Sequence, residues 1–332
     1  MGKSLDQIRE ILGKGKSIVQ PLPTPLERIG EGLDFRVARE IVERAFSHGF
    51  HVFARSTTGA APVAPEGTIR SLIALASDLG RDRDNLVFAG VPQRGTEETV
   101  HYINGFLGQT RQVDVAVLPP PPHFFLSLEE VLSHVKGVHD NTTMPIALYE
   151  FGELFRTSYC LDILSCALGL ERVIGMKSSN ERRYTSDALT VAHARQKFLW
   201  VGSEEDALYF SEQGCDGFVP SAANAVPLLF KRLQLLQPDD NSEKETLCSS
   251  FSQMIQSLYP GKKYREGIIY AMHVLFGAEK KLPQPVGYGL TLGQEKTILE
   301  YLSYAIGDGI LGKSFEPRVH AELDRISSSV PK

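Results

Sequence analysis

Cysteine is scarce in this sequence, and its spacing excludes the common cysteine chemistries. The 332 residues include four cysteines, Cys160, Cys166, Cys215 and Cys248. Five residues separate the first two, which fits neither a redox motif nor a zinc site. We therefore expect reduced thiols in the core or on helix faces, and no metal site built from cysteine.

Long apolar runs and long basic runs are also missing. No run of about 18 apolar residues occurs, and residues 1–6 have no apolar stretch behind their charges, so we expect neither a membrane-spanning helix nor a secretion signal. The net charge of −5 comes without a basic run, which gives no electrostatic footprint for nucleic acid or an anionic membrane. These absences predict a cytoplasmic protein whose partner is a small molecule.

The composition is that of an ordinary globular protein, since 42% hydrophobic and 23% charged residues allow a large core. Short apolar runs rich in β-branched and aromatic residues alternate with stretches in which apolar residues recur at helical spacing. The eight expected strands are 17–25, 50–56, 85–92, 113–119, 144–151, 172–179, 197–202 and 217–221. The expected helices between them are 35–47, 65–79, 96–107, 126–138, 158–168, 186–194, 204–213 and 225–236.

Strands that alternate with helices predict βαβ units and a parallel sheet covered on both faces. Eight such units within about 220 residues close naturally into a (β/α)8 barrel, the TIM-barrel fold. An open doubly wound sheet is the alternative. The dinucleotide-binding form of that alternative is weakened because no G-x-G-x-x-G turn follows the first strand.

The pattern changes after residue 236. A polar break is followed by three more helical stretches, 242–258, 263–276 and 292–306, with no strand among them. We expect a barrel domain over residues 1–237 and a C-terminal three-helix extension over residues 238–332. The apolar positions of this extension need a partner surface, which predicts packing on the barrel or on a neighbouring subunit.

Lys177 ends an apolar run, residues 172–179, that otherwise predicts a fully buried strand. Burying an ammonium group is costly unless the group is paired or loses its proton. A desolvated, neutral lysine is the form that attacks a carbonyl to give a Schiff base. The alternative is a surface lysine at the point where the strand leaves the core, and for an arbitrary lysine that is the commoner case.

The active site of such a barrel lies at the carboxyl ends of its strands, so residues at the other strand ends are further candidates. The second expected strand ends in Thr57, Thr58 and Gly59, a turn of a type that can form an anion-binding nest for a small carboxylate. The fifth ends in Tyr149, which places a phenol at the rim. Taken separately, such a turn is usually only a turn and such a tyrosine usually belongs to the core. Together with Lys177 they indicate a site.

These residues resemble those of the dihydrodipicolinate synthase / N-acetylneuraminate lyase family of pyruvate-dependent class I aldolases. Order and spacing agree over roughly residues 17–227, including the 28 residues from Tyr149 to Lys177, and the three-helix tail resembles that of the family. The segments that carry the resemblance are 56–59, 85–92, 145–149, 173–179, 201–203 and 214–224.

The resemblance implies a role for each matching residue. Lys177 would form an imine with the 2-oxo group of pyruvate or of a pyruvate-derived substrate. Tyr149 would relay protons as a general acid and base. The turn 57–59 would hold the carboxylate through hydroxyl and backbone donors, and Val219 would offer a backbone carbonyl at the floor of the site. No metal or organic cofactor is implied.

The chain departs from the family pattern at three places. Ala60 stands where the family commonly carries glutamate. Residues 118–123 end in His123 after four prolines, where the synthases have a tyrosine that reaches a neighbouring subunit. Arg156 follows Tyr149 by seven residues, so it replaces the carboxylate-binding arginine of the synthases only if the loop is longer; a solvent-facing arginine is the alternative. The aldehyde partner is therefore left open.

Three functions stay open on this basis. The first is a Schiff-base lyase that makes or cleaves a hydroxylated 2-oxo acid with pyruvate as one component. The second is a 2-keto-3-deoxy sugar acid dehydratase working through the same lysine, and the third is a non-catalytic barrel that binds a 2-oxo acid. The resemblance also implies assembly, because members of the family are commonly homotetramers. Phe124 and Phe125 follow His123, and because exposed aromatic clusters usually mark interfaces, we expect at least a homodimer, or a homotetramer, with its contact there.

Overall fold

The structure is a computed structural model that describes residues 2–110, 112–122, 126–284 and 286–329. The chain divides into two compact units by its internal contacts. The first unit contains Met1–Val19, His51–Phe53 and Gly80–Val219, and the second contains Gln20–Phe50, Ala54–Leu79 and Pro220–Lys332. This division does not test the domain boundary expected after residue 237, which stays a prediction.

Eight strands form a closed barrel in sequence order, which confirms the predicted (β/α)8 fold. The pairs whose register is known are parallel throughout, from β3·β4 around to β8·β1. Almost every strand residue is buried, because side chains of both faces are covered in such a barrel. The strands are β1 (Ser17–Pro21), β2 (His51–Ala54), β3 (Val87–Gly90), β4 (Val115–Leu118), β5 (Ile146–Glu150), β6 (Val173–Ser178), β7 (Phe198–Val201) and β8 (Gly217–Phe218).

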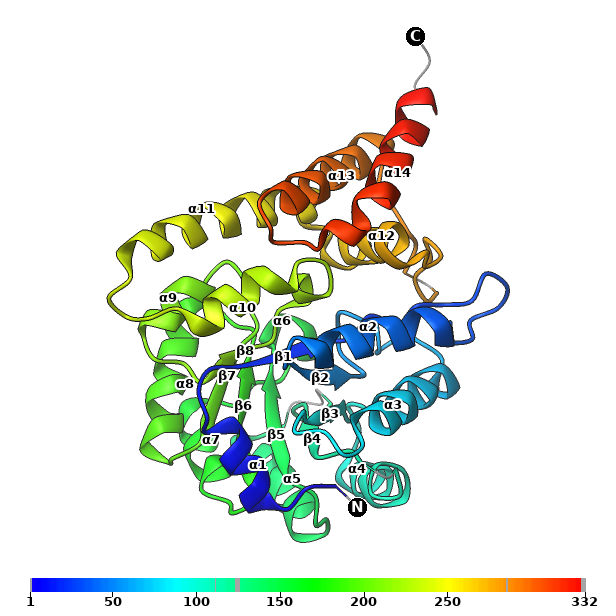
Figure 1. Cartoon of the computed structure of the whole chain (residues 1–332). Coiled ribbons are helices and arrows are strands. Elements are labelled where there is room, and N and C mark those ends of the chain that lie inside the picture. Colours follow the sequence, from blue (N-terminus) through cyan, green and yellow to red (C-terminus); the bar gives the residue numbers. More distant parts are fainter. Residues whose placement is uncertain (1, 111, 123–125, 285, 330–332) are drawn as a thin grey trace. The chain divides into compact units, whose positions relative to one another are not determined.

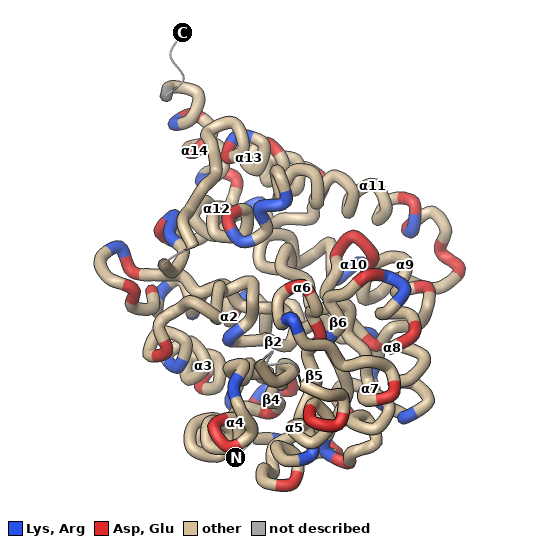
Figure 2. Tube along the Cα trace, turned by 180° about the vertical axis from the view of Figure 1, so that it is seen from behind, with Lys and Arg blue, Asp and Glu red and all other residues tan. Residues whose placement is uncertain are grey.

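Helices of the first unit lie outside the strands, as Figure 1 shows for α5, α7 and α8. They are α1 (Leu5–Leu12), α4 (Thr96–Tyr102) with the π turn Ile103–Leu107, α5 (Leu128–Asp140), α6 (Gly152–Phe155), α7 (Leu161–Leu168), α8 (Arg182–Ala194) and α9 (Ala207–Glu212). In the view of Figure 2, acidic and basic residues are interspersed over these helices, in line with the lack of a basic run in the sequence.

The second unit is helical and contains the C-terminal tail. The three tail helices expected from the sequence are present as α11, α12 and α13, and a further helix, α14, follows them. The helices of this unit are α2 (Phe35–Ser47), α3 (Glu66–Gly80), α10 (Pro227–Leu235), α11 (Asn241–Leu258), α12 (Tyr264–Phe276), α13 (Leu292–Gly307) and α14 (Glu316–Ser329). Among the helices that the structure describes, none is long and apolar enough to cross a membrane.

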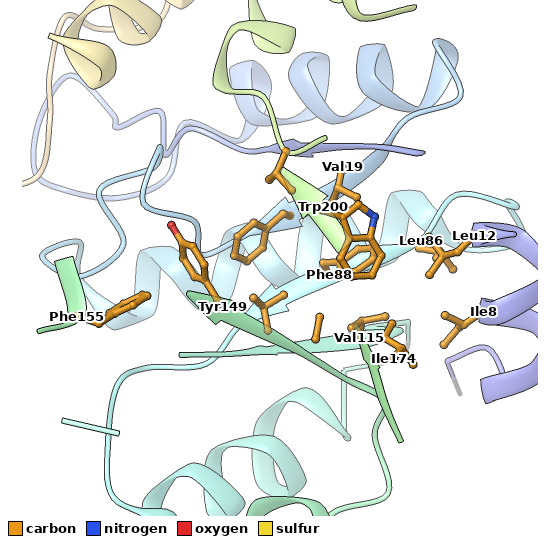
Figure 3. Packing of buried hydrophobic residues seen from close by; sticks show 14 residues of the cluster. Ile8, Leu12, Val19, Leu86, Phe88, Val115, Tyr149, Phe155, Ile174 and Trp200 are labelled. Carbon is orange, nitrogen blue, oxygen red and sulfur yellow. The ribbon is translucent and has the colours of Figure 1, made fainter. Parts of the chain in front are cut away.

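Side chains from strands β1 to β7, from Val219 directly after β8, and from α1 and α6 fill the barrel interior as one apolar cluster. Figure 3 shows Tyr149 and Phe155 at one end of this cluster, Phe88 and Trp200 in the middle, and α1 at the other end. The carboxyl end of the barrel is therefore lined by aromatic rings, and its amino end is filled by aliphatic side chains.

The amino end is sealed by the segment that leads into α1. The Lys3 backbone N–H donates to Asp114 Oδ1 at 3.0 Å, and the Lys3 ammonium donates to the Asn85 carbonyl at 3.1 Å. Helix α1 then presents Ile8 and Leu12, one turn apart and both buried, to the interior. These contacts occupy the amino end, and the expected site residues Tyr149 and Lys177 lie at the opposite, carboxyl end of the strands.

Candidate active site

Lys177 is buried at the carboxyl end of β6, where its exposed fraction is only 7%. Its ammonium nitrogen lies 3.9 Å from the ring centroid of Tyr149 and 5.8 Å from that of Phe53. Cation–π attraction to ring faces therefore holds the head of this side chain. Among the described residues, no carboxylate forms an ion pair with Lys177.

Tyr149 and Lys177 are direct partners across the β5·β6 ladder. Parallel partners in register point to the same face of a sheet, which here is the barrel interior. The backbone ladder therefore brings together two residues that lie 28 positions apart in the sequence. The predicted meeting of lysine and tyrosine at one rim is what the structure shows.

Two rings fix the orientation of Tyr149, which is 4% exposed. Its ring meets Phe53 edge to face at 6.2 Å and 84°, and meets Phe155 at 5.0 Å and 88°. Edge-to-face pairs of this kind stabilise a defined ring orientation by roughly 0.5–1.5 kcal/mol each. The face of the phenol that is turned toward Lys177 is thus set by packing.

Gly202, directly after β7, is a functional position that sequence reasoning missed. A Cβ atom placed on Gly202 would lie 2.9 Å from Cε of Lys177 and 2.2 Å from Oγ of Ser179. Glycine is therefore required for the lysine to follow its present path across the end of β7. The sequence holds no signal for this role, because the space that a glycine leaves depends on neighbours from another strand.

Val219 follows β8 and belongs to the interior cluster with Tyr149. It is 5% exposed, and its backbone N–H donates to the Val201 carbonyl at 2.8 Å. This residue is thus held at the carboxyl end of the barrel by the extension of the β7·β8 ladder. Its backbone carbonyl as a substrate contact stays a prediction.

The turn Thr57–Gly59 belongs to the second unit. Thr58 Oγ1 lies 2.6 Å from Ser221 Oγ, and the Gly59 carbonyl accepts from Thr24 Oγ1 at 2.8 Å. A Cβ atom on Gly59 would lie 2.6 Å from that same Thr24 hydroxyl, so close packing explains the glycine here. The turn is rich in hydroxyls, and its use as a carboxylate site stays a prediction.

The three departures from the family pattern have different positions. Ala60 is fully buried with a left-handed backbone, φ 52°, and packs with Ile269 and Leu282 of the tail. Arg156 ends the one-turn helix α6 with φ 60° and is exposed. His123, Phe124 and Phe125 lie outside the described residues.

The fold and the lysine together define the class of protein. A closed parallel barrel that presents a buried lysine and a tyrosine as ladder partners at the carboxyl end of its strands has these side chains where barrel enzymes carry their active sites. The sequence profile of the Dihydrodipicolinate synthetase family matches residues 14–286. The chain belongs to this family, which confirms the family predicted from the sequence.

Relatives and solved structures agree with this membership. The chain is 24% identical over 224 residues to 4-hydroxy-tetrahydrodipicolinate synthase of Xanthomonas campestris pv. campestris, covering 65% of this chain and 70% of the relative. Among solved structures, a prophage protein of the dihydrodipicolinic acid synthase family from E. coli K12, in complex with pyruvate, has a TM-score of 0.78 and 16% identity, covering 89% of this chain and 99% of that one. A variant of 2-keto-3-deoxygluconate aldolase from Sulfolobus solfataricus has a TM-score of 0.75 and 15% identity, covering 90% and 100%.

Proposed function

We propose that the protein is a Schiff-base lyase that uses pyruvate, or a pyruvate-derived hydroxylated 2-oxo acid, through an imine on Lys177. The observation that carries this proposal is the environment of the lysine: it is 7% exposed, without a carboxylate partner among the described residues, and 3.9 Å from the ring of Tyr149. Burial without a salt bridge contributes little to stability, and an amine placed in this way is suited to attack a carbonyl.

The reaction follows from the two side chains. The Lys177 amine, after giving up a proton, adds to C2 of pyruvate, the former carbonyl oxygen leaves as water after protonation, and an imine results. Loss of a proton from C3 gives an enamine, which adds to the carbonyl carbon of an aldehyde; hydrolysis then releases the product and restores the amine. Tyr149 acts as the general acid and base in these steps. It donates a proton to the departing oxygen at C2, removes one from C3, and donates one to the new hydroxyl. Cleavage runs the same steps in reverse.

The remaining substrate contacts are proposed from the family resemblance. Thr57, Thr58 and Gly59 would bind the carboxylate through hydroxyl and backbone donors, and Val219 would contribute its backbone carbonyl. The hydroxyl-rich character of the turn supports this assignment, because hydroxyls and backbone N–H groups are the usual partners of a carboxylate.

A second candidate function is the dehydration of a 2-keto-3-deoxy sugar acid on the same lysine. A solved structure of 2-keto-3-deoxygluconate aldolase shares this fold, as the solved structures of the synthases do, so the fold is compatible with a substrate of this kind. The absence of the strand 4 tyrosine from the sequence points in the same direction. Assay of both 2-oxo acid cleavage and water loss on a panel of 2-keto-3-deoxy sugar acids separates the two activities.

Borohydride reduction in the presence of pyruvate tests the proposed function. The intact mass is expected to rise by one reduced pyruvate adduct, and peptide mapping is expected to place the adduct on Lys177. Omission of pyruvate provides the control. If saturating pyruvate gives no adduct, the imine mechanism is wrong and a non-catalytic 2-oxo acid binding barrel becomes the better account.

Assembly and location complete the proposal. We propose at least a homodimer, and a tetramer as the fuller assembly, with its contact near the exit of β4, where the chain continues from buried prolines into 123–125. Sedimentation velocity at micromolar concentration is expected to show a species larger than 36.7 kDa, and a monomer would refute the proposal. Dissociation by the pair Phe124→Asp and Phe125→Asp would locate the contact. A cytoplasmic location is proposed as well, and cell fractionation tests it.

A further inference from the structure

Glu150 occupies an unusual place for a carboxylate. It is the last residue of β5, directly after Tyr149, and it is fully buried. Its ladder partner is Ser178, the residue after Lys177. Because side chains alternate along a strand, Glu150 points to the face opposite that of Tyr149, away from the barrel interior. Burying a carboxylate costs free energy unless its oxygens accept hydrogen bonds, so the hydrogen-bond donors around Glu150 explain how it is tolerated there.

The two oxygens of Glu150 join the exits of β5 and β6. Oε2 accepts from the backbone N–H of Tyr159 at 2.7 Å, and Oε1 accepts from the Asn180 side-chain amide at 3.2 Å. The amide oxygen of Asn180 in turn accepts from the Gly152 backbone N–H at 2.9 Å. One carboxylate and one amide therefore fix both ends of the segment that follows β5. No ion pair of Glu150 occurs in the described part of the chain.

This segment contains α6, and α6 carries a ring that packs on Tyr149. Gln93 binds the other end of α6, because its side-chain amide donates to the Phe155 carbonyl at 3.3 Å. With both ends fixed, the Phe155 ring stands 5.0 Å from that of Tyr149 and nearly perpendicular to it. Figure 3 shows the two rings together at the carboxyl end of the cluster.

We infer that Glu150 is a positioning residue for the proposed reaction. Its carboxylate holds α6 through Asn180 and Tyr159, α6 holds Phe155 against the phenol of Tyr149, and the phenol is thereby held over the Lys177 amine. This inference rests on the proposed function, because it gives Glu150 a part in the proton transfers of Tyr149. A group misplaced by about 1 Å loses up to ~100-fold in rate, so a small relaxation of α6 is enough to be measured.

The test measures the single-turnover rate of pyruvate trapping by borohydride in Glu150→Ala and Glu150→Gln. We expect Glu150→Ala to trap pyruvate about 10-fold more slowly than the wild type. Glu150→Gln keeps an acceptor oxygen and the side-chain length, and is expected to recover part of that loss. Glu153→Gln is the matched control, since this exposed glutamate of α6 has no partner among the described residues and its variant should keep the wild-type rate.

A double-mutant cycle separates positioning from general loss of structure. If Glu150 acts through the phenol, Glu150→Ala added to Tyr149→Phe should cause little further loss, because the hydroxyl being positioned is already gone. Circular dichroism verifies that each variant is folded, and Asn180→Ala is the second probe of the same link if Glu150→Ala does not fold. The inference would be overturned if the rate losses of Glu150→Ala and Tyr149→Phe multiply in the double variant. Wild-type trapping rates in both Glu150→Ala and Asn180→Ala would also overturn it. Absence of trapping in the wild type would instead overturn the proposed function, and the inference with it.

Discussion

The two ends of the barrel each hold a lysine, and the surroundings of the two ammonium groups differ. At the amino end, Lys3 lies 3.7 Å from the carboxylate of Asp114 and donates to a backbone carbonyl at 3.1 Å. At the carboxyl end, Lys177 faces the rings of Tyr149 and Phe53. Both side chains are largely buried, but only Lys3 has its hydrogen-bonding capacity matched by oxygens.

This difference distinguishes a structural lysine from the lysine that we propose to be reactive. The Asp114 carboxylate also accepts from the Val87 backbone N–H at 2.8 Å, so it joins Lys3 and the start of β3 in one set of polar contacts. A buried amine that lacks such partners adds little to stability, and its presence indicates a chemical purpose. Positions that depart from the rules of stable packing are those where function is expected.

The strongest test of this comparison exchanges the two lysines one at a time for alanine. Lys177→Ala is expected to abolish pyruvate trapping while the fold is kept, because alanine at a strand end leaves little cavity. Lys3→Ala is expected to keep trapping and to lower the free energy of unfolding by about 1–3 kcal/mol, since it leaves part of a buried carboxylate unpaired. Urea unfolding and mass spectrometry measure both variants. Turnover retained by Lys177→Ala would contradict the proposed Schiff-base mechanism.

Removal of a single hydroxyl at the carboxyl end is the next test. Tyr149→Phe keeps the edge-to-face packing with Phe53 and Phe155 and deletes only the proton-transfer group. We expect the rate to fall at least ~100-fold, with trapping slower but still detectable, in line with general acid–base contributions. Steady-state and single-turnover kinetics provide the measurement. Unchanged kinetics would reassign this tyrosine to the core.

Acid should weaken the amino end through His51. Burial, assisted by the charge of Lys3, lowers the pKa of His51 to about 4, and its Nδ1 accepts from the Leu86 N–H at 3.1 Å. Because the folded-state pKa lies below the unfolded value of about 6.5, this contribution to stability is present above pH 6.5 and is lost as the pH falls toward 4.

The measurement compares His51→Asn, which keeps an acceptor for Leu86, with the wild type. Between pH 7 and pH 4 the wild type is expected to lose roughly 2–3 kcal/mol more of its free energy of unfolding than the variant does. Trapping at pH 7 should be equal in the two proteins, because His51 belongs to the amino end. Parallel pH profiles of stability would show that the buried imidazole does not titrate in this way.

The smallest expected effect is the crowding of Lys177 by one methyl group. In Gly202→Ala the added Cβ would lie 2.9 Å from Lys177 Cε, so the lysine must shift, and we expect imine formation to slow about 10-fold. Gly67→Ala is the matched control: nothing lies within 4 Å of its Cβ position in α3, and trapping should be unchanged. An equal rate in Gly202→Ala would show that the lysine has room to move.

Much of the fold was predictable because each strand is a short apolar run followed by a helical stretch. Helix α1 was missed although its signals are present: Ser4 and Gln7 form a capping box, and Ile8 and Leu12 share one face. Its polar composition hides the two buried side chains. Helix α6 has four residues, too few for a helical period to be visible.

Candidate site residues could be predicted from the sequence where the residue type itself is the signal. They could not be predicted where the signal is the register between neighbouring strands. Lys177 and Tyr149 were identified as candidates because a lysine and a phenol at strand ends are unusual. The roles of Gly202 and Glu150 follow from which atoms adjacent strands place within a few ångströms, and spacing along one chain does not contain that information. The turn Thr57–Gly59 was found by residue type alone, and its role as a carboxylate site stays a prediction.

Trp200 gives the protein a built-in optical reporter. It is the single tryptophan of the chain and the ladder partner of Lys177 on β7. Its indole is 1% exposed and is fixed by a hydrogen bond from Nε1 to Ser17 Oγ at 2.8 Å. Tryptophan fluorescence from this protein thus has one origin, one strand away from the amine. If a 2-oxo acid binds covalently to that amine as proposed, the charge beside the indole changes, and the tryptophan emission is expected to report the event in an unlabelled chain.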